Sequence, residues 1–98
     1  MGAQGQIVID FGATMTDRAT VAVTGQPGIL ASSLCEAWID ATVAAGTVDH
    51  TTDEHSMAAT SIGITCQSIV AATGFTIVAA AGPDGPVRGK FNLAWVYN

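Results

Sequence analysis

Hydrophobic and polar residues alternate along most of the chain, in short runs separated by glycine, proline and polar clusters. In residues 6–11, QIVIDF, the side chains of Ile7 and Ile9 share one face of an extended chain, while Val8 and Asp10 lie on the other. This period of two is typical of half-buried β-strands, and no sustained period of 3.6 residues is present. Strands are therefore predicted at residues 6–11, 19–24, 34–43, 61–70, 75–81 and 89–97.

Turn-forming residues separate these runs and indicate the architecture. The sequence GQPG at 25–28 predicts a type II turn, in which the proline fixes φ at the first central position and Gly28 supplies a positive φ at the second. AATG at 71–74 predicts another turn, and GPDGP at 82–86 predicts a surface hairpin tip. About six or seven short strands with little helix predict an all-β fold, a single antiparallel β-sandwich or small barrel over residues 1–98.

The predicted strand at residues 34–43, LCEAWIDATV, has two unlike faces. One face carries Trp38 between the acids Glu36 and Asp40, so this tryptophan is either covered by a loop or available to a partner. The other face is small and apolar, which assigns it to the core. It consists of Cys35, Ala37, Ile39 and Ala41.

The last predicted strand, residues 89–97, places four large apolar or aromatic side chains on one face. Trp95 shares this face with Phe91 and Leu93, so we expect it in the core of the domain. Tyr97 follows at the end of the strand, where its large and rigid ring makes it a candidate anchor for a partner.

Both histidines of the chain, His50 and His55, lie in one polar segment, VDHTTDEHS, together with three of the eight acids. Zinc sites use three or four ligands, often in short repeats such as CxxC or HExxH, and the chain contains neither. A metal is therefore not predicted, although His50, His55 and Asp49 are the residues that would ligate one. No nucleophile is tied to the histidines by sequence, so neither catalysis nor a cofactor is predicted.

We expect this segment to belong to the longest polar connection, residues 44–56, and to form a loop or a single helical turn. Residues 57–59 could continue a helical turn that begins near Thr52. A turn that begins near Thr52 would place Asp53 and Glu54 where their charges complement the helix dipole. The polar side chains would then cap backbone groups or pair with charges nearby. On this interpretation, replacing both histidines with alanine would leave the domain folded.

The composition indicates a surface with few charges. Of the 98 residues, 49% are hydrophobic and only 11% are charged, whereas a free monomer usually carries more surface charge. Burial against other subunits would explain the difference, and serine, threonine and glycine offer an alternative source of solubility. The net charge of −5, with Arg18, Arg88 and Lys90 as the only basic residues, argues against binding to nucleic acid or to anionic membranes.

The remaining features indicate the cellular compartment in which the protein is made. The start of the sequence lacks the basic and apolar regions of a signal peptide, and the most apolar stretch is too short for a membrane span. We therefore expect synthesis in the cytosol. Cys35 and Cys66 do not make a disulfide framework, and buried free thiols are expected for both.

The runs GQIVIDFG, VAVTGQPGI, EAWIDA, DHTTDEH, GFTI and GKFNLAWVYN follow one another along nearly the whole chain. In this pattern the sequence resembles small proteins encoded among the virion structural genes of tailed bacteriophages. The resemblance implies a non-enzymatic component of the particle, in particular a head decoration or cement protein that stabilises the capsid lattice. A tail- or fibre-associated module that binds a receptor or carbohydrate is the alternative, because tryptophans also stack on sugars.

The resemblance also implies a place and a set of partners. The protein would assemble into the virion in the bacterial cytoplasm and would contact the major capsid protein or other virion proteins. Self-association is expected as well, with a trimer as one form, whereas nucleic-acid and membrane partners are not. The residues predicted to make these contacts are Trp38, Glu36, Asp40, His50, His55, Arg88, Lys90 and Tyr97.

Overall fold

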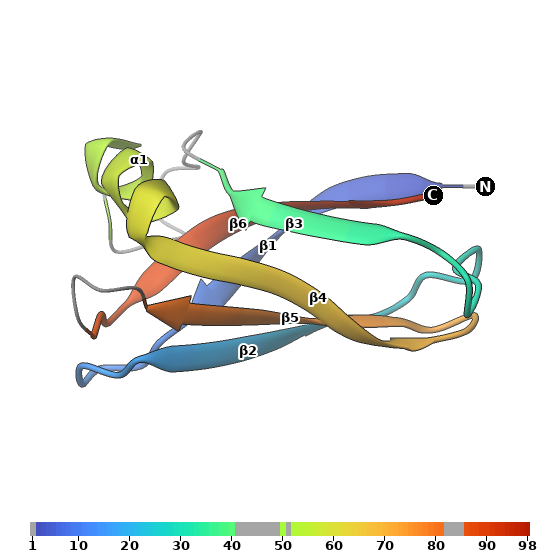
Figure 1. Cartoon of the computed structure of the whole chain (residues 1–98), viewed down its shortest axis with the longest axis horizontal. Coiled ribbons are helices and arrows are strands. Elements are labelled where there is room, and N and C mark those ends of the chain that lie inside the picture. The colour runs from blue at the N-terminus through green and yellow to red at the C-terminus, as the bar shows by residue number, and fades with distance from the viewer. Residues whose placement is uncertain (1, 41–49, 51, 82–85) are drawn as a thin grey trace.

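The computed structural model describes residues 2–40, 50, 52–81 and 86–98. These residues form the strands β1 (Ala3–Asp10), β2 (Arg18–Val23), β3 (Cys35–Ile39), β4 (Ile62–Val70), β5 (Gly74–Ala81) and β6 (Lys90–Tyr97), and the helix α1 (Thr52–Ser61). The strands make two antiparallel sheets, in the orders β1-β6-β3 and β2-β5-β4, which face one another (Figure 1). The all-β class and the antiparallel sandwich predicted from the sequence are confirmed.

Five of the six strands lie within a few residues of their predicted positions, and β3 is the exception. It was expected to reach residue 43, but its last residue is Ile39. Residues 41–43 lie outside the described part of the chain, so their predicted strand is not tested. The two faces of β3 are as predicted in the described part, because Ala37 and Ile39 are buried while Glu36 and Trp38 are exposed.

The connections follow the turn signals with one correction. The Ile29 N–H donates to the Gln26 carbonyl at 3.3 Å, which closes a turn around Pro27. Gly28 does not have a positive φ, so the predicted type II geometry is wrong, and Gly25 supplies the positive φ of this connection instead. The turn predicted at 71–74 is present, with the Thr73 N–H bonded to the Val70 carbonyl. Most of the predicted tip at 82–86 lies outside the described residues.

The core lies between the two sheets. Ile9 of β1, Ile77 of β5 and Leu93 of β6 are fully buried, because alternate side chains of each strand point toward the opposite sheet. An aromatic group fills the end of the core away from α1, where the Trp95 ring stacks parallel to Tyr97 and meets Phe75 edge-on. The assignment of Trp95 to the core is therefore confirmed.

Helix α1 covers one end of the sandwich and runs directly into β4 (Figure 1). It spans ten residues, so it begins at the predicted Thr52, is longer than a single turn and ends two residues beyond Ala59. Asp53 and Glu54 lie in its first turn, as expected from the helix dipole. His55 and Ala58 form its buried side, while its outer residues are exposed. No helix in the described residues has the length and apolar character needed to cross a membrane.

Two glycines allow a direct test of how closely the β5 backbone approaches β2. A Cβ atom at Gly74 would overlap the carbonyl oxygen of Val23, whereas a Cβ at Gly63 would make only an ordinary contact of 3.8 Å with the Ala80 oxygen. We expect Gly74→Ala to lower the free energy of unfolding by about 2 kcal/mol or more. Gly63→Ala should change it by less than about 0.5 kcal/mol, and urea denaturation of both variants checks the pair. Equal effects of the two substitutions would contradict the close approach of the β5 backbone to β2.

Candidate functional site

The two histidines meet on the ring of Phe91 in β6. The His50 ring stacks on the Phe91 ring, with 4.1 Å between centroids and 11° between planes. The His55 ring meets the same phenylalanine edge-on at 5.3 Å. The aromatic group continues inward, because Phe11 also packs edge-on against Phe91 at 5.9 Å. The polar segment of the sequence is therefore attached to the core through an aromatic contact.

His50 lies at the rim of this group and is partly exposed. Its Nε2 lies 2.8 Å from the carbonyl oxygen of Arg88 and donates the hydrogen bond, because a carbonyl can only accept. Its Nδ1 lies 3.6 Å from a carboxylate oxygen of Glu54, one turn along. These contacts fix the orientation of the ring between the start of α1 and the segment that leads into β6.

His55 is fully buried and has a different role. Its Nε2 accepts a hydrogen bond of 2.8 Å from the backbone N–H of Asn92. A nitrogen that accepts from an amide carries no proton itself, so the His55 ring in this arrangement is neutral with its proton on Nδ1. The imidazole thus serves as a hydrogen-bond acceptor for the main chain of β6.

The end of β3 explains why an acceptor is needed there. The pairing of β3 with β6 runs only as far as Ile39 opposite Leu93. In the next pair of a regular antiparallel ladder, Asp40 and Asn92 would exchange two hydrogen bonds. The Asp40 N–H does donate to the Asn92 carbonyl at 2.9 Å, but the Asn92 N–H donates to His55 instead. The histidine therefore replaces a strand carbonyl where the ladder ends.

This arrangement bears on the chemistry that the polar segment can perform. Both Nε2 atoms take part in hydrogen bonds to the backbone, with the Arg88 carbonyl and the Asn92 amide. No group of three or more His, Cys, Asp or Glu side chains in the described residues is placed to hold a metal ion. Asp49, the third residue considered as a ligand, lies outside the described residues. The geometry indicates a structural junction.

Two residues predicted at an interface are buried within the chain itself. His55 has no exposed surface, because it fills the space between α1 and β6. Tyr97 lies on the same inner face as Trp95, and its hydroxyl donates to the side-chain oxygen of Gln26 at 3.2 Å. Neither side chain can anchor a partner unless the domain opens.

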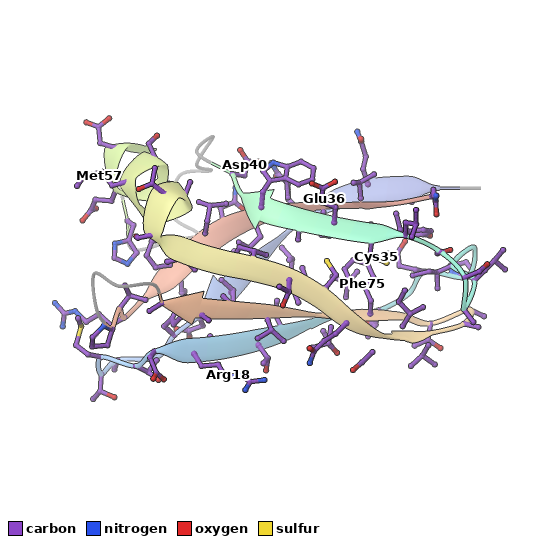
Figure 2. The ribbon with its side chains drawn as sticks, viewed as in Figure 1. Arg18, Cys35, Glu36, Asp40, Met57 and Phe75 are labelled. Atoms are coloured by element: carbon purple, nitrogen blue, oxygen red, sulfur yellow. The ribbon has the colours of Figure 1, made fainter. Side chains whose placement is uncertain are left out.

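The other interface candidates divide between two regions. Glu36, Trp38 and Asp40 lie along the outer side of β3, and Figure 2 shows both acids directed away from the opposite sheet. Arg88 and Lys90 lie at the start of β6, near the histidines, and Lys90 is opposite Asp10 in the register. The structure therefore does not gather all the candidates on one surface.

Sequence reasoning missed several residues that define these regions. Phe91 was recognised as a core residue, but its role as the platform for both histidines depends on a fold contact with no local signal. Gln4 and Gln6 lie on the outer side of β1, and Gln6 Nε2 donates to an Asp40 carboxylate oxygen at 2.6 Å. The alternation in QIVIDF could have placed Gln6 outside, but not beside a residue of β3.

No protein-family model matches this chain, and no curated protein or solved structure matches it either. The description of its surfaces therefore depends on its own geometry.

The cysteines provide a prediction about reactivity. Both are free and half-buried, and Cys35 is directed into the space between the sheets (Figure 2). Burial, assisted by the nearby Cys35 and Glu36, raises the pKa of the Cys66 thiol to about 11. Because the thiolate is the reactive form, the rate of Cys66 alkylation by iodoacetamide should rise about tenfold per pH unit up to that pKa. Mass spectrometry of peptides from the digested, unchanged protein separates alkylation of Cys66 from that of Cys35, and a plateau of the Cys66 rate near pH 9 would count against the burial.

The His55 contact predicts a loss of stability that the sequence did not indicate. His55→Ala should lower the free energy of unfolding by about 2–4 kcal/mol, because it leaves a buried amide without its acceptor and opens a cavity. His55→Gln should lose less, since its side-chain oxygen can still accept. The matched control His50→Ala removes a partly exposed ring and should cost about 1 kcal/mol. Urea denaturation measures all three, and an equal loss for the two alanine variants would refute the structural role of His55.

Proposed function

We propose that this chain is a virion structural protein of a tailed bacteriophage that binds the head lattice as a decoration or cement protein. The sequence resemblance supports the virion context. The observation that carries the binding role is an uncharged, apolar surface at the end of the sandwich away from α1. This surface, called the apolar end below, is formed by residues 24–34 and 68–74.

The apolar end is built from two connections that lie side by side (Figure 1). The Ala72 N–H donates to the Ile29 carbonyl, and the Gln26 N–H donates to the Thr73 carbonyl, each at 2.9 Å. These bonds join the turn after β4 to the segment between β2 and β3. The end is therefore an ordered surface of the fold.

The side chains of the apolar end suit a protein contact. Leu30, Leu34 and Val70 are 59%, 73% and 56% exposed. Neither TGQPGILASSL at 24–34 nor SIVAATG at 68–74 contains a charged residue. The centre of a protein interface is depleted in charge and is more apolar than the rest of the surface, which matches the composition of these two segments. Burial of these side chains by a neighbour would be favourable, because it removes apolar surface from water.

A cement role fits a contact of this size. One small apolar end supplies modest affinity, but many copies on a repeated lattice act together. The partner in this proposal is the major capsid protein or another virion protein, and self-association, including a trimer around a lattice axis, would place several apolar ends together. The protein would then be part of the virion, assembled in the bacterial cytoplasm, and would act without catalysis.

A tail- or fibre-associated binding module is the second candidate. The observation that favours it is the exposure of Trp38, at 46%, on the outer side of β3. A module of this kind would be present in few copies per particle, whereas a decoration protein would be present in many. The number of copies in purified virions, measured by mass spectrometry, therefore separates the two candidates.

The cement proposal predicts a rescue that depends on the apolar end. Particles that lack this protein should rupture at a lower temperature than complete particles, and added purified protein should bind them and restore the rupture temperature. The double variant Leu30→Ser/Leu34→Ser should remain folded but bind at least about tenfold more weakly, because it removes apolar contact area. Sedimentation of particles with bound protein and thermal release of the genome are the measurements.

Met15→Ser is the matched control, because Met15 is also exposed at 58% but lies in the connection between β1 and β2 at the opposite end. This variant should bind and stabilise particles like the unchanged protein. Equal binding by the double variant and the control would exclude the apolar end as the contact. Unchanged rupture of particles that lack the protein would exclude cementing altogether.

A further inference from the structure

The outer face of the β1-β6-β3 sheet has a regular arrangement of large and small side chains. In one cross-strand row, Gln6 of β1 and Trp38 of β3 lie on either side of Ala94 in β6. In the neighbouring row, Gln4 and Glu36 lie on either side of Val96. The side chains of the central strand are therefore smaller than those of the two outer strands.

This arrangement leaves a hollow over Ala94. The space between Trp38 and the two glutamines has a volume of about 340 Å³. Its floor is held from below, because the Trp95 ring packs against Gly5 so closely that a Cβ at Gly5 would lie 2.6 Å from the ring. A sheet with this support offers a preformed site, which reduces the entropy lost on binding. We call this space the Trp38 hollow.

Polar groups lie in and beside the Trp38 hollow, because Gln4 and Gln6 line it and Glu36 and Asp40 lie next to Trp38 along the chain. Gln6 Nε2 donates to an Asp40 carboxylate oxygen at 2.6 Å, so the amide and the carboxylate hold each other in place. Gln4 and Glu36 are exposed in the adjacent row. Ligand sites typically combine an apolar contact surface with a few polar groups that set orientation. Here the apolar surface is the Trp38 ring, and the polar groups are amides and carboxylates.

The charges of this face restrict the ligand. Glu36 and Asp40 lie on either side of Trp38, and the basic residue of the face, Lys90, lies two rows from Ala94 and opposite Asp10. An anionic ligand would therefore lie close to two carboxylates, which would repel it. A simple cation would use the ring and the carboxylates but would leave the glutamine amides without a function. A polyhydroxyl ligand uses every group, because hydroxyls both donate to carboxylates and pair with amides.

We propose that the Trp38 hollow binds a neutral saccharide. One apolar face of a sugar ring lies against the Trp38 indole over Ala94. The sugar hydroxyls donate to Glu36 and Asp40 and pair with the side-chain amides of Gln4 and Gln6. This inference rests on the second candidate function, whose ligand class it names, and it does not depend on the cement role. The residues that line the hollow are not residues of the apolar end.

The isolated protein provides the test, because Trp38 and Trp95 give two distinct indole N–H signals in an NMR spectrum. Maltose, lactose and N,N′-diacetylchitobiose are the probes, titrated separately into labelled protein. At least one should shift the Trp38 signal in a saturable manner with a Kd of about 1 mM, while the buried Trp95 signal stays in place. This readout requires no virion, so its failure leaves the cement proposal unaffected.

Two variants locate the binding. Trp38→Ala removes the stacking surface, and Ala94→Leu fills the hollow without removing any polar group; each should weaken binding at least about tenfold. Met57→Ala is the matched control, because Met57 is an exposed side chain on the outer side of α1 and should leave the affinity unchanged (Figure 2).

Unchanged affinity in Ala94→Leu would overturn the proposal, as would the absence of a saturable shift with all three sugars. Saturable binding of tetramethylammonium in place of the sugars would overturn it in favour of a cation site.

Discussion

The hydrogen bond from the Asn92 amide to His55 is the interaction on which the arrangement of this end of the sandwich depends. β3 ends at Ile39, before it has paired with all of β6, and the amide of Asn92 is then a buried donor. A buried amide without a partner costs about 1–3 kcal/mol, so the fold requires an acceptor at this position. Helix α1 supplies it, and this requirement sets where the helix packs.

This contact also engages the polar segment within the fold, so the surfaces available for binding lie elsewhere. His55 is committed to the main chain of β6, and His50 rests on Phe91 with its Nε2 bonded to the Arg88 carbonyl. The surfaces that remain are the apolar end, which suits a protein neighbour, and the Trp38 hollow, which suits a sugar. The two surfaces adjoin at the start of β3, because Leu34 of the apolar end and Glu36 of the outer face line the same pocket.

Much of the fold could be predicted from the sequence, because alternation decides which side chains of a strand face inward. It located the six strands, placed Trp95 in the core and assigned Trp38 to the outer side of β3. The same alternation placed Tyr97 on the inner face beside Trp95, where its ring is buried in the structure. The partner of His55 could not be predicted, since 37 residues separate it from Asn92 and the need for an acceptor arises only where β3 ends.

The most direct test of the role of His55 is an NMR measurement of nitrogen–nitrogen coupling across the hydrogen bond from the Asn92 amide to the imidazole. The structure predicts a measurable coupling to His55 Nε2, which accepts the hydrogen bond and so carries no proton in this arrangement. Absence of this coupling, together with a proton on Nε2, would contradict the assignment of His55 as the acceptor that completes the β3–β6 ladder.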